Sequence, residues 1–215
     1  MPIILHQALS PEGEIGIWKI EEPEEWFLEK LELAPAEARQ LSGIKGRRRT
    51  EWLAVRQLVH DMSGREQRGA FIKDDHGKPH LKGAAWFISI SHSHELAAAI
   101  AAPRPVGIDI QFLVGKIERL ANRYMRPEEM ASLDAIRRIE HLHIYWGAKE
   151  ALYKAYGRRQ IDFCQNLLVE PFDFDFGQGY TRAEIVKEDY HEYYDVFYQQ
   201  HGEYILVYVM MRLEE

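Results

Sequence analysis

The chain contains the stretch Trp146-Gly-Ala-Lys149-Glu150-Ala-Leu-Tyr-Lys154, which decides how the second half of the sequence folds. It is rich in Ala, Leu, Glu and Lys, and this composition predicts a helix. Residues four apart lie on one face of a helix, so Trp146, Glu150 and Lys154 project together. The stretch therefore predicts an apolar anchor, a carboxylate and an ammonium group side by side.

The second informative stretch is Val106-Gly-Ile-Asp109-Ile-Gln111, an apolar run with one acid in its middle. Such a run predicts a buried strand, and a lone buried carboxylate is costly unless it is compensated. A divalent cation shared by Asp109 and Glu150 would compensate it, since Mg²⁺ takes carboxylate oxygens completed by water and phosphate. The alternatives are a surface ion pair between Glu150 and Lys154, and a turn capped by Asp109.

The composition of the 215 residues, 46% hydrophobic and 28% charged, is that of a soluble globular protein. The net charge of -7 argues against a general nucleic-acid binder, which would usually be basic. One cysteine, Cys164, excludes an intrachain disulfide and a Cys-rich zinc site. No apolar stretch approaches the ~20 residues that cross a bilayer, and the N-terminus lacks the basic region of a signal peptide. We therefore expect a cytoplasmic protein that acts on neither nucleic acid nor membrane.

Hydrophobic periodicity divides the chain into helical and strand patterns. Helices are predicted over residues 24–33, 34–41, 47–59, 116–122, 127–138 and 140–156, and strands over 2–6, 14–20, 85–90, 96–102, around Asp109, and over 181–186, 192–199 and 204–213. The polar segment 91–95 is predicted to be a turn. Pro103-Arg-Pro105 is the best candidate for a boundary, which gives an N-terminal half of residues 1–102 and a C-terminal half of residues 103–215.

A cluster of arginines opens the helix predicted over residues 47–59. Arg47, Arg48 and Arg49 stand at its start, and Arg56 shares a helical face with Arg49. Guanidinium groups match phosphate oxygens, so the cluster suits an anionic ligand. The alternative is a solvated charge run, although cations at a helix start oppose the helix dipole.

Two further segments carry polar groups that suit an anion. Ser91 and His92 follow a predicted strand and offer hydrogen-bond donors, unless they form only a solvated turn. Lys78 lies in a tight turn, and a plain surface turn is its simplest interpretation. A zinc site built from His80, His92 and His94 is a weaker alternative, because no carboxylate or Cys is spaced to complete it.

Taken in order along the chain, four motifs resemble the 4'-phosphopantetheinyl transferases of the larger, Sfp-like type. They are Gly77-Lys78-Pro79, Phe87-Ile-Ser-Ile-Ser91-His92-Ser93, Gly107-Ile108-Asp109 and Trp146-x-x-Lys149-Glu150-Ala-x-x-Lys154. Each motif alone is common, whereas the ordered set is specific.

The resemblance implies an α+β fold of two similar α/β halves related by a pseudo-twofold axis, with coenzyme A and Mg²⁺ or Mn²⁺ between them. It implies a holo-acyl-carrier-protein synthase type of enzyme, which transfers the 4'-phosphopantetheine arm of coenzyme A to a serine of an apo acyl or peptidyl carrier protein. Adenosine 3',5'-bisphosphate is the second product. A chain that holds both halves is expected to be monomeric. The choice between fatty-acid, polyketide and nonribosomal-peptide biosynthesis stays open.

The resemblance also implies roles for individual residues. Asp109 and Glu150 resemble the metal-binding acids, and Glu150 would also be the base toward the carrier serine, directly or through water. Lys154 would stabilise the leaving phosphate or protonate it. Gln111 stands where the family often has a second acid, and its amide carbonyl would be a weaker metal ligand. The expected coenzyme A contacts are Arg48, Arg49, Arg56, Lys78, Ser91 and His92.

Two alternative functions remain for the same residues. The protein could hold coenzyme A or a carrier without turnover, with Gln111 marking a weakened metal site. It could instead be a Mg²⁺-dependent nuclease that uses Asp109, Glu150 and Lys154, an alternative that the acidic net charge opposes.

Overall fold

The computed structural model describes residues 2–213, which divide into two compact units. The N-terminal unit ends at Pro103 and the C-terminal unit begins at Arg104, within the segment expected to form a boundary. Each unit combines helices with an antiparallel sheet, which confirms the predicted α+β class. Their relation by a pseudo-twofold axis stays a prediction. Within residues 2–213 no helix combines the length and apolar character that crossing a bilayer requires.

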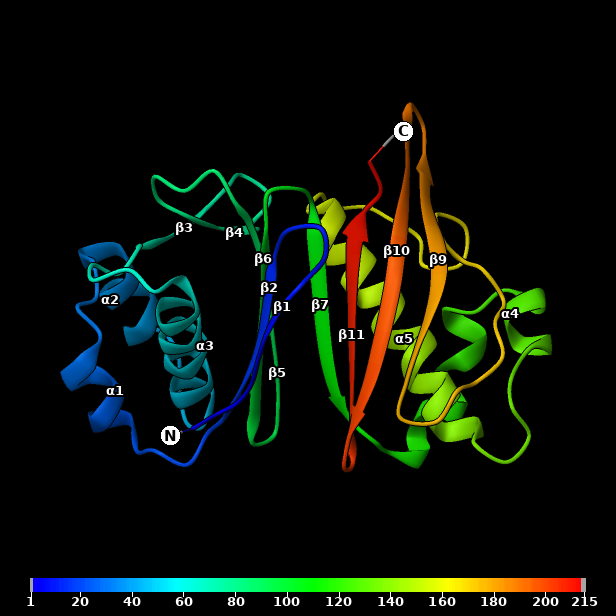
Figure 1. The fold of residues 1–215 in the computed structure, drawn as a ribbon, viewed down its shortest axis with the longest axis horizontal. Coiled ribbons are helices and arrows are strands. Elements are labelled where there is room, and N and C mark those ends of the chain that lie inside the picture. Colours follow the sequence, from blue (N-terminus) through cyan, green and yellow to red (C-terminus); the bar gives the residue numbers. More distant parts are fainter. Residues whose placement is uncertain (1, 214–215) are drawn as a thin grey trace. The chain divides into compact units, whose positions relative to one another are not determined.

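The N-terminal unit is a four-stranded antiparallel sheet with one long helix across it. Its elements are β1 (Ile3–Ala8), β2 (Glu14–Lys19), α1 (Glu24–Lys30), α2 (Pro35–Ser42), α3 (Arg48–Ser63), β3 (Phe71–Lys73), β4 (Pro79–Leu81), β5 (Phe87–Ser93) and β6 (Leu96–Ala102). The sheet has the order β1-β2-β6-β5, and β3 and β4 form a separate hairpin. Helix α3 packs on β2 and β6 (Figure 1), where Trp18, Leu53 and Leu58 are buried.

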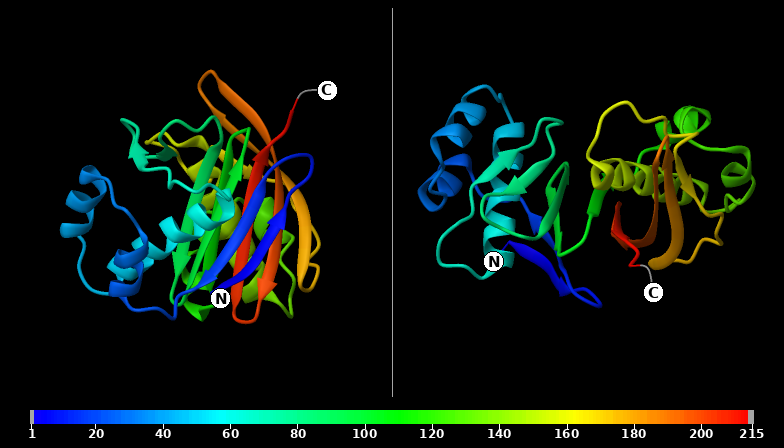
Figure 2. Two further views of the ribbon diagram at one scale, coloured as in Figure 1. Left: turned by 60° about the vertical axis from the view of Figure 1, so that its left-hand side comes forward. Right: turned by 90° about the horizontal axis from the view of Figure 1, so that it is seen from above.

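The C-terminal unit repeats this plan with a larger sheet. Its elements are β7 (Val106–Phe112), the 3₁₀ helix η1 (Gly115–Arg123), α4 (Pro127–Ala131), α5 (Arg138–Tyr156), β8 (Leu167–Val169), β9 (Gln178–Lys187), β10 (Tyr190–His201) and β11 (Tyr204–Met211). The strand order is β7-β11-β10-β9-β8. Helix α5 lies along one face of the sheet (Figure 2), mainly on β7 and β11.

The end of β5 differs from the sequence prediction. Residues 91–95 were expected to form a turn, but the strand continues to Ser93, and Ser91 pairs with Ala98 of β6. The turn is confined to His94 and Glu95, and His94 has a left-handed backbone with a φ of 50°. Hydroxyl and imidazole groups therefore stand on a strand, where alternate side chains point to opposite faces.

Helix α4 is shorter than predicted, and β8 was not predicted at all. The helical pattern of residues 127–138 ends at Ala131. The Asp134 carboxylate accepts hydrogen bonds from the backbone N–H groups of Ile136 and Arg137, at 2.8 and 2.6 Å. Such local bonds compete with helical ones, so they account for the break before α5 begins at Arg138.

Each unit is stabilised by a buried carboxylate of its own. In the N-terminal unit, α2 begins at Pro35, and Glu37 lies in its first turn with no exposed surface. The Glu37 carboxylate accepts hydrogen bonds from the backbone N–H groups of Ala34 and Phe71, both at 3.1 Å, and from Arg56 Nε at 3.2 Å. One side chain thus ties the start of α2 to strand β3 and to the centre of α3.

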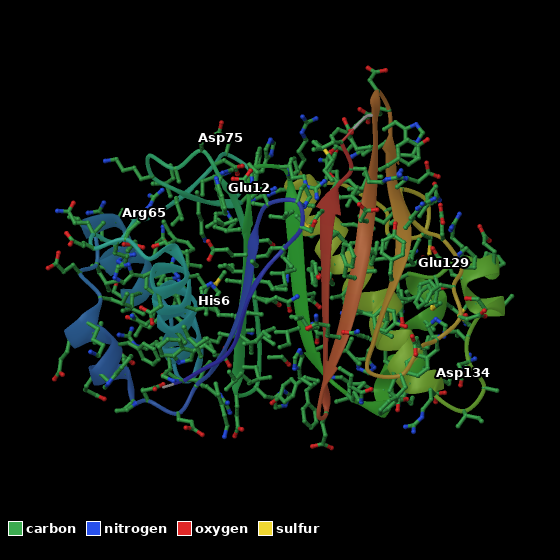
Figure 3. The ribbon with its side chains drawn as sticks, viewed as in Figure 1. His6, Glu12, Arg65, Asp75, Glu129 and Asp134 are labelled. Carbon is green, nitrogen blue, oxygen red and sulfur yellow. The ribbon has the colours of Figure 1, made fainter. Side chains whose placement is uncertain are left out.

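The C-terminal unit uses the same device in the same order along the chain. Helix α4 begins at Pro127, and Glu129, labelled in Figure 3, is fully buried in its first turn. Its carboxylate accepts from the N–H groups of Arg126 and Val169, at 2.8 and 3.1 Å, and pairs with Lys149 Nζ at 2.8 Å. The carboxylate therefore links α4, β8 and the centre of α5, as Glu37 links α2, β3 and α3.

Replacement of Glu129 tests this arrangement. Glu129→Gln removes the countercharge of the fully buried Lys149, so the free energy of unfolding should fall by about 3–5 kcal/mol. The neighbouring Glu128→Gln is the matched control, because Glu128 is half-exposed and its pairing with Arg126 should be worth at most about 1 kcal/mol. Urea unfolding measures both changes. Equal losses for the two variants would show that Glu129 does not anchor α5.

Candidate active site

Helix α5 approaches strand β7 more closely than ordinary side chains allow. A Cβ atom at Gly107 of β7 would lie 1.8 Å from the backbone oxygen of Ala151 on α5. A Cβ atom at Gly147 of α5 would lie 2.7 Å from Val207 Cγ2 on β11. The two glycines therefore allow the helix backbone to rest on the sheet, and this fixes which residues of α5 face β7.

This contact brings Lys154 to Asp109. Asp109 lies on β7 with only 3% of its surface exposed, and Lys154 Nζ is 2.7 Å from its Oδ1. Lys154 also donates to the backbone oxygen of Ile108 at 2.8 Å, and Gln111 Nε2 lies 2.9 Å from Asp109 Oδ2. The sequence predicted that a cation shared with Glu150 would compensate this buried acid. In the structure the Lys154 ammonium supplies a positive charge itself.

Glu150 is the second acid near this position. Burial and, to a smaller degree, the Asp109 charge together raise the pKa of its carboxyl to about 7, while the Lys154 ammonium opposes both effects. Its side chain makes no hydrogen bond or ion pair with any other residue of the described range 2–213. The alternative of a surface ion pair between Glu150 and Lys154 is therefore wrong, because Lys154 pairs with Asp109 instead.

The oxygen atoms gathered here suit a hard divalent cation. Two carboxylates, of Asp109 and Glu150, and the amide of Gln111 are the types of group that bind Mg²⁺ alongside phosphate oxygens. The mutual repulsion of the two acids is the electrostatic situation that a dication relieves. No group of three or more His, Cys, Asp or Glu side chains that could hold a metal occurs within residues 2–213. The zinc site considered for His80, His92 and His94 therefore has no support.

Lys149 lies between Trp146 and Glu150 in the sequence, yet it faces the interior. Its side chain has no exposed surface, and its Nζ pairs with Glu129 and donates to the backbone oxygen of Phe163 at 3.0 Å. Trp146 packs edge-on against Tyr124 with ring centroids 5.1 Å apart. These two residues fix the rotation of α5, a role that helical spacing alone did not reveal for Lys149.

The N-terminal unit contributes a groove of about 730 Å³ beside α3. Arg48, Lys45 and His92 are the ionisable groups that line it together with Arg56. The His92 ring lies 3.1 Å from a carboxylate oxygen of Glu51, which orients it. This groove is lined by three of the residues predicted to contact an anion, Arg48, Arg56 and His92, and by Lys45, which no sequence pattern had singled out.

The other predicted contacts lie differently. Arg49 pairs with Glu24 at 2.6 Å, and Arg56 pairs with the buried Glu37, so these two guanidinium groups bind partners inside the unit. Ser91 is buried on β5, and burial lowers the pKa of the Lys78 ammonium to about 8. Neither Ser91 nor Lys78 is among the residues that line the groove.

Comparisons with known proteins bear on the C-terminal unit above all. A sequence model of the 4'-phosphopantetheinyl transferase superfamily matches residues 105–209, a range that contains Asp109, Gln111, Glu150 and Lys154. A curated protein of Synechocystis sp., which carries the name "Putative 4'-phosphopantetheinyl transferase", is 29% identical over 143 residues. That alignment spans 61% of this chain and 58% of the relative.

The close approach at Gly107 can be tested by adding one methyl group. Gly107→Ala should lower the free energy of unfolding by about 3 kcal/mol or more, because the new Cβ meets a backbone oxygen that cannot move aside. Gly115→Ala is the matched control, since a Cβ there meets nothing within 4 Å, and its effect should stay within about 0.5 kcal/mol. Urea unfolding measures both. A Gly107→Ala protein as stable as the control would show that the helix is free to move off the strand.

Proposed function

We propose that this protein transfers the 4'-phosphopantetheine arm of coenzyme A to a serine hydroxyl of an apo acyl or peptidyl carrier protein, a proposal supported by the match of residues 105–209 to the 4'-phosphopantetheinyl transferase superfamily. The serine oxygen forms a bond to the β-phosphorus of the coenzyme A diphosphate. The bond from that phosphorus to the bridging oxygen breaks, and adenosine 3',5'-bisphosphate leaves with the electron pair. The serine proton passes to a base of the enzyme.

The observation that carries the proposal is the cluster of Asp109, Glu150 and Lys154, which lies inside the range that matches the superfamily. Phosphoryl transfer needs positioning and positive charge more than covalent chemistry. The Lys154 ammonium supplies a fixed positive charge beside β7. We assign it to the oxygens of the departing phosphate, with Asp109 holding it in place.

Glu150 is the proposed base. A carboxyl whose pKa is raised to about 7 is a much better proton acceptor than an ordinary carboxylate, and it is still deprotonated in a large fraction of molecules at neutral pH. Its side chain has no partner within residues 2–213 that would compete for the serine proton. The half-buried position on α5 leaves it accessible.

A divalent cation fits the same residues. We propose that Asp109 and Glu150 hold Mg²⁺ or Mn²⁺, with the amide oxygen of Gln111 as a weaker third ligand. When bound, the ion would neutralise charge on the diphosphate. The Gln111 amide nitrogen faces Asp109, so the amide oxygen is free to turn toward a cation without adding a negative charge.

The groove beside α3 is the proposed site for the nucleotide end of coenzyme A. Arg48 and Lys45 give it positive charge, His92 adds a ring that can donate a hydrogen bond, and the Trp52 ring provides an apolar surface. Phosphate groups suit guanidinium forks, and a purine suits an aromatic face. Arg49 and Arg56 support this groove from inside, since both are bonded to acids of the same unit.

Loss of the proposed base is the direct test. Glu150→Gln should reduce transfer by about 100-fold or more, because general-base catalysis contributes that much. The assay is the intact mass of an apo carrier incubated with coenzyme A, Mg²⁺ and the enzyme. In the native protein, transfer should fall as the pH drops through the pKa of Glu150, which is about 7 without metal and lower with it.

A second glutamate of the same helix provides the control. Glu140→Gln, which removes only a surface pairing with Arg137, should leave transfer unchanged. A Glu150→Gln enzyme that is as active as Glu140→Gln would refute the role of Glu150. If the native protein modified none of several different apo carriers while calorimetry showed coenzyme A binding without help from Mg²⁺, that result would favour a binding module of the same fold.

The amide at position 111 offers a further test. Gln111→Glu adds a carboxylate beside Asp109, so the Mg²⁺ concentration needed for half-maximal transfer should fall by roughly 10-fold, with transfer unchanged or faster. Gln111→Ala removes the oxygen ligand and serves as the matched comparison. A large loss of transfer in Gln111→Glu would mean that this position does not face the cation.

A further inference from the structure

The buried carboxylate cluster of the N-terminal unit carries more positive than negative charge. Arg68 pairs with both oxygens of Glu37 in addition to the pairing from Arg56, and its Nη1 lies 3.0 Å from Oε1. The side chains of Arg56 and Arg68 are only 4% and 7% exposed, and that of Glu37 is not exposed at all. Two guanidinium groups therefore share one carboxylate, which leaves one positive charge without a counterion in a buried place.

The corresponding cluster of the C-terminal unit is balanced. There Lys149 and Arg126 are the two cations, and Glu129 pairs with both of them. Arg126 has a second acid, because its Nη1 lies 2.8 Å from the carboxylate of Glu128. Two positive groups thus meet two negative groups. Within residues 2–213, the ion pairs of the N-terminal cluster include no second acid beside Glu37.

Two buried nitrogen atoms beside the N-terminal cluster have no hydrogen-bond partner. They are Arg68 Nε and His60 Nδ1, unpaired with respect to residues 2–213. Arg68 Nε is always a donor, and His60 Nδ1 is a donor in one of its two tautomers. A buried donor without an acceptor destabilises the fold, so an acceptor is expected nearby.

Both side chains line one small cavity at the C-terminal end of α3. Its volume is about 10 Å³, which is room for a single water-sized occupant. Arg56 and Arg65 line it as well, and none of the lining residues is acidic. Arg65, labelled in Figure 3, is exposed and follows α3 by two residues. The wall of the cavity is therefore cationic on several sides.

We propose that this cavity binds one small monovalent anion of about the size of chloride. A water molecule would satisfy the unpaired donors, but it would leave the buried positive charge uncompensated, which is costly in an interior. An anion satisfies both, because it accepts hydrogen bonds and restores the two-against-two balance seen around Glu129.

The anion also stabilises the wall of the groove beside α3. Arg56 lines both the cavity and the groove, and its guanidinium group stacks on the Trp52 ring, 3.1 Å from the centroid. Desolvation and the nearby Arg68 both lower the pKa of Arg56, to about 10, even though Glu37 opposes this. A negative charge in the cavity reduces the electrostatic repulsion between Arg56 and Arg68. It thereby stabilises the stacking of Arg56 on the Trp52 ring.

Thermal unfolding of the full chain in different sodium salts tests the proposal. At equal ionic strength, chloride or bromide should raise Tm by roughly 5 °C relative to gluconate, which is too large for the cavity, and the rise should saturate with concentration. General screening by salt affects both anions alike, so it cannot produce the difference. Equal Tm values in chloride and gluconate would overturn the proposal and leave a water molecule as the occupant.

Variants that leave the ion pairs of Glu37 intact test whether the chloride-dependent rise in Tm comes from this cavity. His60→Leu removes an unpaired nitrogen, and Arg65→Gln removes a surface charge without threatening the fold. Each should lose most of the chloride-dependent rise in Tm, whereas Arg39→Gln, an exposed control with the same change of charge, should keep it. A full rise in both cavity variants would place the anion elsewhere. Anomalous scattering from a crystal of the protein in bromide should show a peak inside the cavity, and its absence there would equally refute the site.

Discussion

The contact between the backbone of α5 and strand β7 is the constraint on which the candidate site depends. At Gly107 the strand has no side chain, so Ala151 of the helix can approach to a distance that any Cβ atom would forbid. This contact fixes the distance of the helix from the sheet and its rotation about its own axis. On one side Lys154 reaches Asp109 and the backbone of Ile108, and on the other Lys149 reaches the interior. A shift of this helix by one residue would leave a buried carboxylate and a buried ammonium without partners, which is the costly case for both.

The two units share a framework but not its chemistry. Arg56 of α3 and Lys149 of α5 occupy the same structural place, each bound to a carboxylate in the first turn of the preceding helix. The residue after Arg56 is Gln57, which bonds to Asp61 four residues later at 2.8 Å. The corresponding positions after Lys149 hold Glu150 and Lys154. In the N-terminal unit these two positions hydrogen-bond to each other. In the C-terminal unit they hold an acid and a cation, which interact with Asp109 of β7.

Local sequence patterns predicted the elements and one face of the site, but not its contacts. The helix around Glu150 and the strand around Asp109 followed from composition and apolar runs, as did the alignment of Glu150 with Lys154. Which acid Lys154 would pair with depends on how α5 rests on β7, and no local pattern specifies that. The same limit hid the structural pairing of Arg56, because an arginine on a helix looks the same in sequence whether it binds a ligand or a buried glutamate.

The charge balance at the site explains how one cluster can respond to both protons and metal ions. With Glu150 ionised, the two acids and Lys154 sum to one negative charge in a half-buried place, and burial together with the Asp109 charge raises the pKa of Glu150 to about 7. A proton on Glu150 makes the cluster neutral. A divalent cation that displaces this proton would make the cluster positive by one charge, which suits a diphosphate. In the proposed metal site, proton and cation would therefore compete for the same acids. Gln111 is neutral, so it would favour the cation less than a third carboxylate would.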